Sequence, residues 1–217
     1  PPKSLRFAWK GMVMIMKVYA DNAATTKMSR KAVEAMLPFF ETIYANPSSL
    51  HTPGQEAARA LNEARATIAK NLGCEAREIY FTSGGSEADN QAILSAAALG
   101  EKRGKKHIIS TAIEHHAVLH TLEKLKKKGF DITLLGVDEN GIVSPREVAS
   151  AIRGDTCLVS VMYANNEIGT VQPIDEIGKI CGERGVLFHT DAVAAAGYLH
   201  IDVKAQNIDM LSLSAHK

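Results

Sequence analysis

The hydrophobic pattern changes its period along the chain. Apolar side chains recur at helical spacing over residues 32–40, and again over residues 57–72 after a Pro53-Gly54 turn. Short apolar runs of strand character then alternate with helical stretches; these runs are Ile79 to Thr82, His107 to Thr111, Ile132 to Val137, Cys157 to Tyr163, Val186 to His189 and Ile208 to Ser212. Such alternation is typical of parallel strands covered by helices. The pattern therefore predicts an α/β domain with a mostly parallel sheet.

Local signals add two helix boundaries. Ser144, Pro145 and Glu147 match an N-cap, a first-turn proline and a capping-box acid, which predicts a helix over residues 145–153. The run of lysines at 126–128 has two interpretations, a nucleic-acid patch or a solvated helix end before Gly129. We favour the helix end, because lysines in a last turn complement the helix dipole.

Composition narrows the class of protein. Among 217 residues, 25 basic and 24 acidic side chains leave a formal charge of +1, which argues against nucleic acid or an acidic membrane bound through bulk charge. No segment has the roughly 20 apolar residues that a membrane span needs. The three cysteines are Cys74, Cys157 and Cys181, an odd number without metal-like spacing. We therefore expect a cytoplasmic protein without a disulfide framework, a zinc site or a membrane segment.

The two ends differ from the rest. Residues 1–15 are predicted to be an upstream extension or disordered, with Met16 as the expected natural start. Residues 16–217 show no repeat or linker and are expected to form one domain. The chain stops on Lys217, directly after a strand-like run, so we expect a fragment.

A glycine-rich turn is the first candidate for chemistry. Residues 81–88 follow an apolar run and open an alanine-rich helix. Glycines and the free N–H groups of a helix N-terminus can hold a phosphate. The alternative is a plain tight turn with Ser86 as the N-cap.

Two further residues stand at predicted strand ends. Asp191 follows one apolar strand, where ligands of α/β sheets usually lie, although a turn residue or helix cap is the alternative. Lys217 follows the next strand, and an amine among hydroxyls and a histidine is a candidate Schiff-base lysine rather than a solvated tail. Pyridoxal phosphate needs a lysine, an acid for its ring nitrogen and a helix N-terminus for its phosphate. The sequence therefore predicts pyridoxal 5'-phosphate as cofactor, and no metal.

Seven ordered motifs then resemble one family. They are Asp21 to Thr26, Asn46 to Ser49, Thr82 to Asn90, Ile113 to His115, Asn165 to Gly169, His189 to Ala192 and Ser212 to Lys217. Together they are similar to those of cysteine desulfurases in the class V aminotransferase group. The resemblance implies a three-layer α/β/α architecture, the large domain of the PLP-dependent transferase fold type I. It also implies that residues 16–217 hold the N-terminal arm and most of this domain, truncated before a small C-terminal domain.

The resemblance also assigns roles to single residues. It implies that Lys217 forms the Schiff base, that Asp191 pairs with the ring nitrogen and that His115 stacks on the ring and moves protons. Without it, His115 would be read as a helix cap or a core histidine. The remaining implied cofactor contacts are Gly85, Ser86, Ser214 and His216 on the phosphate side and Asn166 near the phenolic oxygen and the substrate carboxylate.

One position departs from the family pattern. Ala194 stands where members commonly carry a glutamine that contacts the cofactor's phenolic oxygen. Loss of that hydrogen bond is expected to alter the Schiff base and to weaken cofactor binding by about 1 kcal/mol.

The implied activity is removal of sulfur from L-cysteine, which gives L-alanine and an enzyme persulfide. The sulfur would pass to an acceptor such as an iron–sulfur scaffold protein or a tRNA-thiolation enzyme, and a homodimer is implied. The attacking cysteine should be exposed and thiolate-prone, whereas all three cysteines here read as buried or half-buried. We therefore expect the attacking cysteine and a substrate-binding arginine to lie beyond Lys217. We also expect the fragment itself to be inactive.

Two alternatives stay open. Selenocysteine lyase or another class V PLP enzyme would share these motifs, because the motifs mainly hold the cofactor. A cofactor-free interaction module that retains the fold is the non-enzyme alternative, and it would show no absorption band with pyridoxal phosphate.

Overall fold

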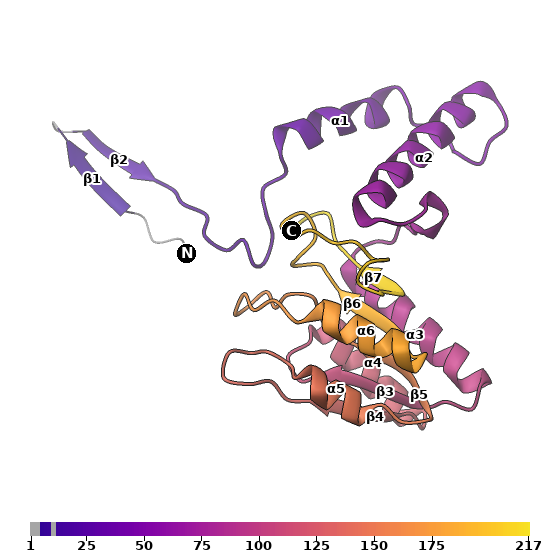
Figure 1. Cartoon of the computed structure of the whole chain (residues 1–217). Coiled ribbons are helices and arrows are strands. Elements are labelled where there is room, and N and C mark those ends of the chain that lie inside the picture. Colours follow the sequence, from indigo (N-terminus) through magenta and orange to yellow (C-terminus); the bar gives the residue numbers. More distant parts are fainter. Residues whose placement is uncertain (1–4, 10–11) are drawn as a thin grey trace.

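The computed structural model describes residues 5–9 and 12–217. The chain begins with an antiparallel hairpin of β1 (Leu5–Trp9) and β2 (Met12–Met16), which extends away from the other elements in Figure 1. The hydrophobic pattern did not predict this hairpin. The expectation that residues 1–15 are an upstream extension falls partly outside the described residues and stays a prediction.

A five-stranded sheet forms the centre of the fold. Its strands are β3 (His107–Thr111), β4 (Asp131–Leu135), β5 (Thr156–Ser160), β6 (Leu187–Asp191) and β7 (Met210–Ser212). Their order is β4-β3-β5-β6-β7, and every neighbouring pair is parallel. Parallel neighbours require crossover connections. Helices supply these connections from β3 to β6, whereas residues 192–209 join β6 to β7 without a helix. The predicted α/β class is confirmed.

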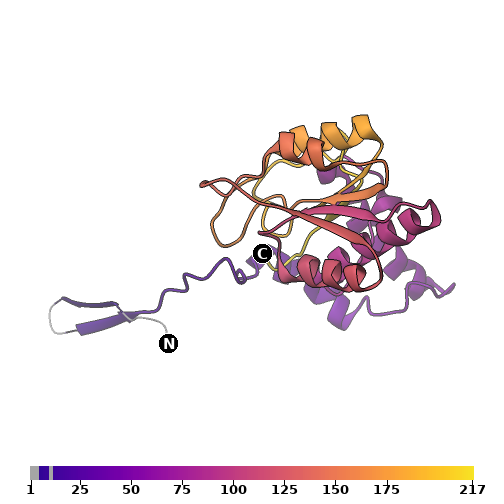
Figure 2. The same ribbon diagram turned by 90° about the horizontal axis from the view of Figure 1, so that it is seen from below.

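Helices cover both faces of the sheet. The helices α3 (Gly85–Lys102) and α4 (His116–Lys127) lie on one face, and α5 (Pro145–Ala151) and α6 (Ile174–Arg184) lie on the other (Figure 2). Each face has its own core of buried residues, so that Leu158 of β5 packs with α3 and α4 while its neighbour Val159 packs with α5 and α6. Burial on both faces explains the continuous apolar runs in the strands. The three-layer architecture follows.

Three helical segments precede α3 in the described chain. They are α1 (Arg30–Glu41), α2 (Thr52–Leu72) and the short 3₁₀ helix η1 (Ala76–Glu78). Both predicted amphipathic helices are present, but Pro53 and Gly54 lie inside the first turn of α2 rather than before it. His51 explains the earlier start, because its Nδ1 accepts the N–H of Gly54 at 3.2 Å and caps the helix. Pro53 needs no such partner, since it has no N–H.

One predicted strand is wrong. Residues 79–82 form no strand among the described residues, and Tyr80 in this run is 75% exposed. A strand requires a paired neighbour, and no described strand lies beside this run. The helix predicted over 145–153 is present and ends two residues earlier, at Ala151. The described chain contains no helix that is both long and apolar enough to span a membrane.

The packing of α6 gives a prediction about two of its glycines. A Cβ at Gly178 would collide with the carbonyl oxygen of Gln206, whereas a Cβ at Gly182 would stay 3.6 Å from Asn207 Oδ1. We expect Gly178→Ala to lower the free energy of unfolding by about 1–3 kcal/mol through overpacking. The matched Gly182→Ala should raise it by up to about 1 kcal/mol, because alanine favours the helix. Urea unfolding of both variants checks this, and equal effects would contradict the packing described for α6.

Candidate active site

A cavity of about 450 Å³ opens where β6 and β7 end and α3 begins. Ligands of open α/β sheets bind at this carboxyl edge. The structure brings to this one cavity all eight residues singled out in the sequence, which are Gly85, Ser86, His115, Asn166, Asp191, Ser214, His216 and Lys217. Their positions span more than half of the chain, so the fold alone makes them neighbours.

The segment after β7 is held by the N-terminal arm. The N–H of Thr26 donates to the carbonyl oxygen of His216 at 2.9 Å, and the Thr26 hydroxyl donates to the same oxygen at 3.0 Å. The His216 ring lies 3.0 Å from the Thr25 hydroxyl through Nδ1. These bonds join residues about 190 positions apart and fix the segment that carries Lys217. They also place Asp21, Ala23 and Ala24 on the cavity wall.

The glycine-rich turn leads directly into α3. The helix begins at Gly85 with Gly84 as its N-cap, so the interpretation of Ser86 as N-cap is wrong. Gly84 has no side chain, and no side-chain hydrogen bond caps this end within the described chain. Glu87 accepts the N–H and the hydroxyl of Ser83, each at 2.6 Å. A Cβ at Gly85 would lie 2.8 Å from Val193 Cγ2. The backbone here therefore meets the cavity with its uncapped N–H groups, which attract an anion.

Asp191 is a buried acid of the cavity. It ends β6, is 5% exposed, and its Oδ1 accepts the N–H of Val193 at 2.9 Å. Burial raises the pKa of Asp191, while the Val193 hydrogen bond and the nearby His115 and Lys217 side chains oppose this shift. Asp191 is thus a buried carboxyl group, and the groups that favour its charged form are the Val193 N–H, His115 and Lys217.

His115 and Lys217 face Asp191 from two other elements. His115 caps α4, and its Nδ1 accepts the N–H of Ala117 at 3.1 Å. In a neutral ring the proton must then lie on Nε2. The structure therefore shows the helix-cap role and the cavity position in the same residue. Lys217 is half-buried, and its backbone oxygen accepts the Tyr198 hydroxyl at 2.8 Å.

Asn165 and Asn166 are neighbours with different roles. Buried Asn165 donates to the Ile113 carbonyl at 3.0 Å and accepts the N–H groups of Glu167 and Ile168, so it holds the loop. Asn166 lines the cavity, and its Nδ2 donates to Glu167 Oε1 at 2.7 Å. Ala194 also lines the cavity and offers only a methyl group. Its expected effect on a cofactor stays a prediction.

Sequence reasoning missed Asp89. This residue lies on α3, is 1% exposed and lines the cavity with Asp191. Burial and the charge of Asp191 raise its pKa to about 7. The signal was present in the sequence, because Asp89 shares the buried face of α3 with Ile93, Ala96 and Gly100. A carboxyl group on the apolar face of a helix is costly and marks a possible function.

Glu114 is a third buried carboxyl. Its Oε1 accepts the Thr111 hydroxyl at 2.7 Å and the N–H of Met162 at 2.9 Å. Its Oε2 has no hydrogen-bond partner in the described part of the chain. Burial raises the pKa of Glu114 to about 8. Glu114 is therefore largely protonated at neutral pH and contributes a neutral group behind the cavity.

The three cysteines lie outside this cavity. Cys157 is buried in β5, and Cys181 is buried in α6, where burial raises its pKa to about 12. Half-buried Cys74 has its pKa raised by burial and by Glu78. Each thiol is therefore held in its protonated, less nucleophilic form. Among residues 5–9 and 12–217, no group of three or more His, Cys, Asp and Glu side chains could hold a metal ion.

Comparison with known proteins identifies the family. The Aminotransferase class-V model matches residues 18–217. The chain therefore belongs to the class V aminotransferase family. Two similar relatives are both named cysteine desulfurase IscS. Cysteine desulfurase IscS of Clostridium botulinum (strain Hall) is 53% identical over 204 residues, which cover 94% of this chain and 51% of that protein. Cysteine desulfurase IscS of Methanosarcina thermophila is 54% identical over 200 residues, or 92% of this chain and 49% of that protein.

Solved structures agree with this assignment. A structure of SspA in complex with cysteine is 44% identical with a TM-score of 0.87, and it covers 91% of this chain and 57% of that chain. A NifS-like protein is 40% identical with a TM-score of 0.89, covering 93% and 55% respectively. The predicted transferase fold is confirmed. The chain spans about half the length of the curated relatives it matches.

The burial of Glu114 gives a pH-dependent prediction. Its folded pKa of about 8 exceeds the ordinary value of 4.5, so the folded chain binds more protons than the unfolded chain between these values. The free energy of unfolding must then fall as pH rises through this window. We expect Glu114→Gln, which has the same shape and no charge, to flatten that fall. Urea unfolding at several pH values between about 5 and 8.5 measures it, and parallel curves for the two proteins would contradict it.

Proposed function

We propose that the cavity binds pyridoxal phosphate and that this chain provides the cofactor-binding part of a cysteine desulfurase. One observation carries the proposal: a lysine amine, a buried carboxylate and an uncapped helix N-terminus line the same cavity. On this proposal residues 16–217 comprise the N-terminal arm and most of the large domain. The family and the names of the relatives support it.

The residues present fit the cofactor. The close approach of Gly85 to Val193 leaves backbone N–H groups, rather than a side chain, to meet a phosphate. One turn further along α3, Asp89 Oδ1 is buried without a hydrogen-bond partner among the described residues. Two carboxyl groups on the cavity floor suit a ring that carries a positive charge. A volume of about 450 Å³ lies in the range of small-molecule cofactor sites.

Each residue then has a definite task. When bound, pyridoxal phosphate would supply an aldehyde that condenses with amines and a ring that accepts electron density from the substrate carbon. Lys217 would hold the cofactor covalently and, once displaced by the substrate amine, move a proton at the substrate carbon. Asp191 would accept the N–H of the ring. His115 would cover the ring face with its Nε2–H free to donate, since Nδ1 is engaged by Ala117.

The phosphate and substrate groups would lie at opposite ends. The amides at the start of α3, with Ser86, Ser214 and His216, would bind the phosphate. Asn166 would face the phenolic oxygen and the substrate carboxylate. His216 is held in place by Thr25 and Thr26, so the arm orients the phosphate side.

The proposed substrate is L-cysteine, and a structural neighbour is described in complex with cysteine. An attacking thiol takes the substrate sulfur as the carbon–sulfur bond breaks, which yields L-alanine and a persulfide. We place that thiol outside Cys74, Cys157 and Cys181, because none of them lines the cavity. An iron–sulfur scaffold protein or a tRNA-thiolation enzyme is the proposed acceptor, and a homodimer the proposed assembly.

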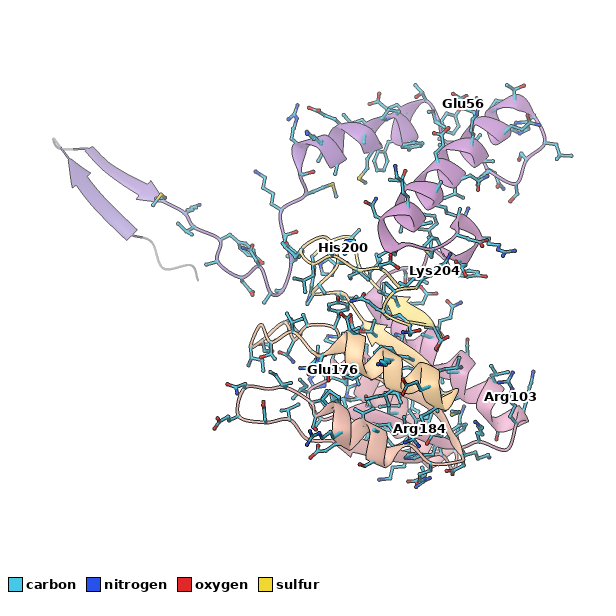
Figure 3. All side chains as sticks on the ribbon, in the orientation of Figure 1. Glu56, Arg103, Glu176, Arg184, His200 and Lys204 are labelled. Carbon is cyan, nitrogen blue, oxygen red and sulfur yellow. The ribbon has the colours of Figure 1, made fainter. Side chains whose placement is uncertain are left out.

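Covalent trapping tests the cofactor proposal. The purified chain should develop a visible absorption band with pyridoxal phosphate, and borohydride should fix the cofactor on the peptide containing Lys217. Lys217→Ala should lose the band, whereas Lys204→Ala, which removes an exposed lysine (Figure 3), should keep it. A well-folded chain without a band, or a cofactor fixed on another lysine, would contradict the proposal.

Turnover tests the placement of the thiol. With L-cysteine, pyridoxal phosphate and a reductant, we expect the 217-residue chain to release no more sulfide than Lys217→Ala, because its three thiols are buried or half-buried and lie away from the cavity. Sulfide release clearly above this control, lost on substitution of one cysteine, would show that this chain holds the nucleophile.

A further inference from the structure

A row of polar side chains crosses the buried face of the sheet beneath α3. Ser110, Ser160, His189 and Ser212 lie on β3, β5, β6 and β7, and each is at most 1% exposed. The Ser110 hydroxyl donates to the Ser160 carbonyl at 2.8 Å. The Ser160 hydroxyl lies 2.9 Å from His189 Nδ1, and the Ser212 hydroxyl lies 3.0 Å from His189 Nε2. Both ring nitrogens of His189 are thus engaged by neutral groups.

Asp89 reaches this row from α3. Its Oδ1 lies 3.7 Å from His189 Nε2, too far for a hydrogen bond, and has no other partner in the part of the chain that the structure describes. Burial lowers the pKa of His189 to about 4, so this ring is neutral and cannot balance a charge on Asp89. An ionised Asp89 would therefore be a buried charge without a counter-ion in contact.

Asp191 adds a second buried carboxyl group beside Asp89. It follows His189 by two residues on β6, so both side chains leave the same face of the strand, and Asp191 is paired in register with Ser212. Asp89 and Asp191 also line the same cavity. Two carboxyl groups that share a buried site do not both ionise readily.

The surrounding charges decide which of the two carboxyls is ionised. The titratable groups that face this pair are His189 on β6, Glu114 and His115 before α4, Asp21 on the arm, Glu167, and His216 and Lys217 after β7. Asp191 accepts a backbone N–H and has Lys217 and His115 nearby, both of which lower its pKa. Asp89 has only the Ser212 hydroxyl to favour its charged form. The proton therefore belongs on Asp89.

We propose that Asp89 is a positioning residue for Asp191: it keeps a proton while the cavity holds no cationic ligand and releases that proton when a cationic ring binds against Asp191. This inference rests on the proposed function for the identity of the ring. In the free chain the pair carries one negative charge. With a singly positive ring bound and Asp89 ionised, ring and pair together again carry one negative charge, so the buried floor keeps its net charge on binding.

The first test needs no cofactor. Because the folded pKa of Asp89 is raised, the folded chain retains a proton that the unfolded chain has lost, and its stability falls as pH rises toward about 7. We expect Asp89→Asn to remove this pH dependence of stability. The ratio of the variant's unfolding equilibrium constant to that of the original chain should therefore fall by roughly tenfold to a hundredfold between about pH 5 and pH 8. Glu176→Gln, an exposed carboxyl on α6 (Figure 3), is the matched control and should give a constant ratio.

The second test measures protons released on binding. Pyridoxal phosphate is titrated into the original chain and into Asp89→Asn near pH 6.5, in two buffers of different ionisation enthalpy. Proton changes on the cofactor and on Lys217 are common to both proteins, so the difference between them reports Asp89. We expect the original chain to release up to about one proton more than the variant. Equal proton release would overturn the proposal.

The outcomes separate this inference from the proposed function. If the original chain binds no pyridoxal phosphate, the proposed function fails, while the cofactor-free pH series still tests whether Asp89 holds a proton. If the ratio of the unfolding equilibrium constants of Asp89→Asn and the original chain stays constant across pH, the inference is overturned even if the cofactor binds. If Asp89→Asn does not fold, carbon-13 NMR of aspartate-labelled original chain replaces it. A carboxyl group that titrates near pH 7 supports the proposal. If no carboxyl group titrates near pH 7, the proposal is overturned.

Discussion

A carboxylate buried at the end of β6 is the constraint on which the site depends. Asp191 is 5% exposed and accepts one backbone N–H, which leaves most of its charge to be balanced from across the cavity. A buried ion without such balance would cost several kcal/mol. The fold places Lys217, after β7, and His115, at the start of α4, near this carboxyl group, and both lower its pKa. Both side chains lie near Asp191 because the sheet is parallel, since parallel strands deliver their carboxyl ends to one edge.

The same edge explains why an anion and a cation can be bound together. The uncapped start of α3 offers N–H groups, and the carboxyl groups of Asp89 and Asp191 line the same cavity. A ligand with a phosphate at one end and a basic ring nitrogen at the other matches this polarity. The N-terminal arm completes the arrangement, because Thr25 and Thr26 hold His216 and thereby the lysine next to it. Binding chemistry and chain topology are thus coupled through a few long-range hydrogen bonds.

Much of this could be predicted from the sequence, for identifiable reasons. The apolar runs around Ile108 and Leu158 are continuous because those strands are buried on both faces, and Asp191 and Lys217 stood out as polar residues at strand ends. Residues 79–82 were misread because periodicity shows that a segment is apolar but not whether a strand lies beside it. Asp89 was missed for a related reason. Its burial depends on α3 lying over β6 and β7, a tertiary relation that the pattern within the helix only hints at.

The central claim is that this cavity orients one cofactor between the α3 N-terminus, Asp191 and Lys217. A crystal structure of the chain grown with pyridoxal phosphate tests it most directly. We expect a phosphate on the amides of Gly85 and Ser86, a ring nitrogen within hydrogen-bond distance of the Asp191 carboxylate, and a covalent bond to Lys217 Nζ. A phosphate away from α3, or a ring nitrogen facing a group other than Asp191, would contradict it.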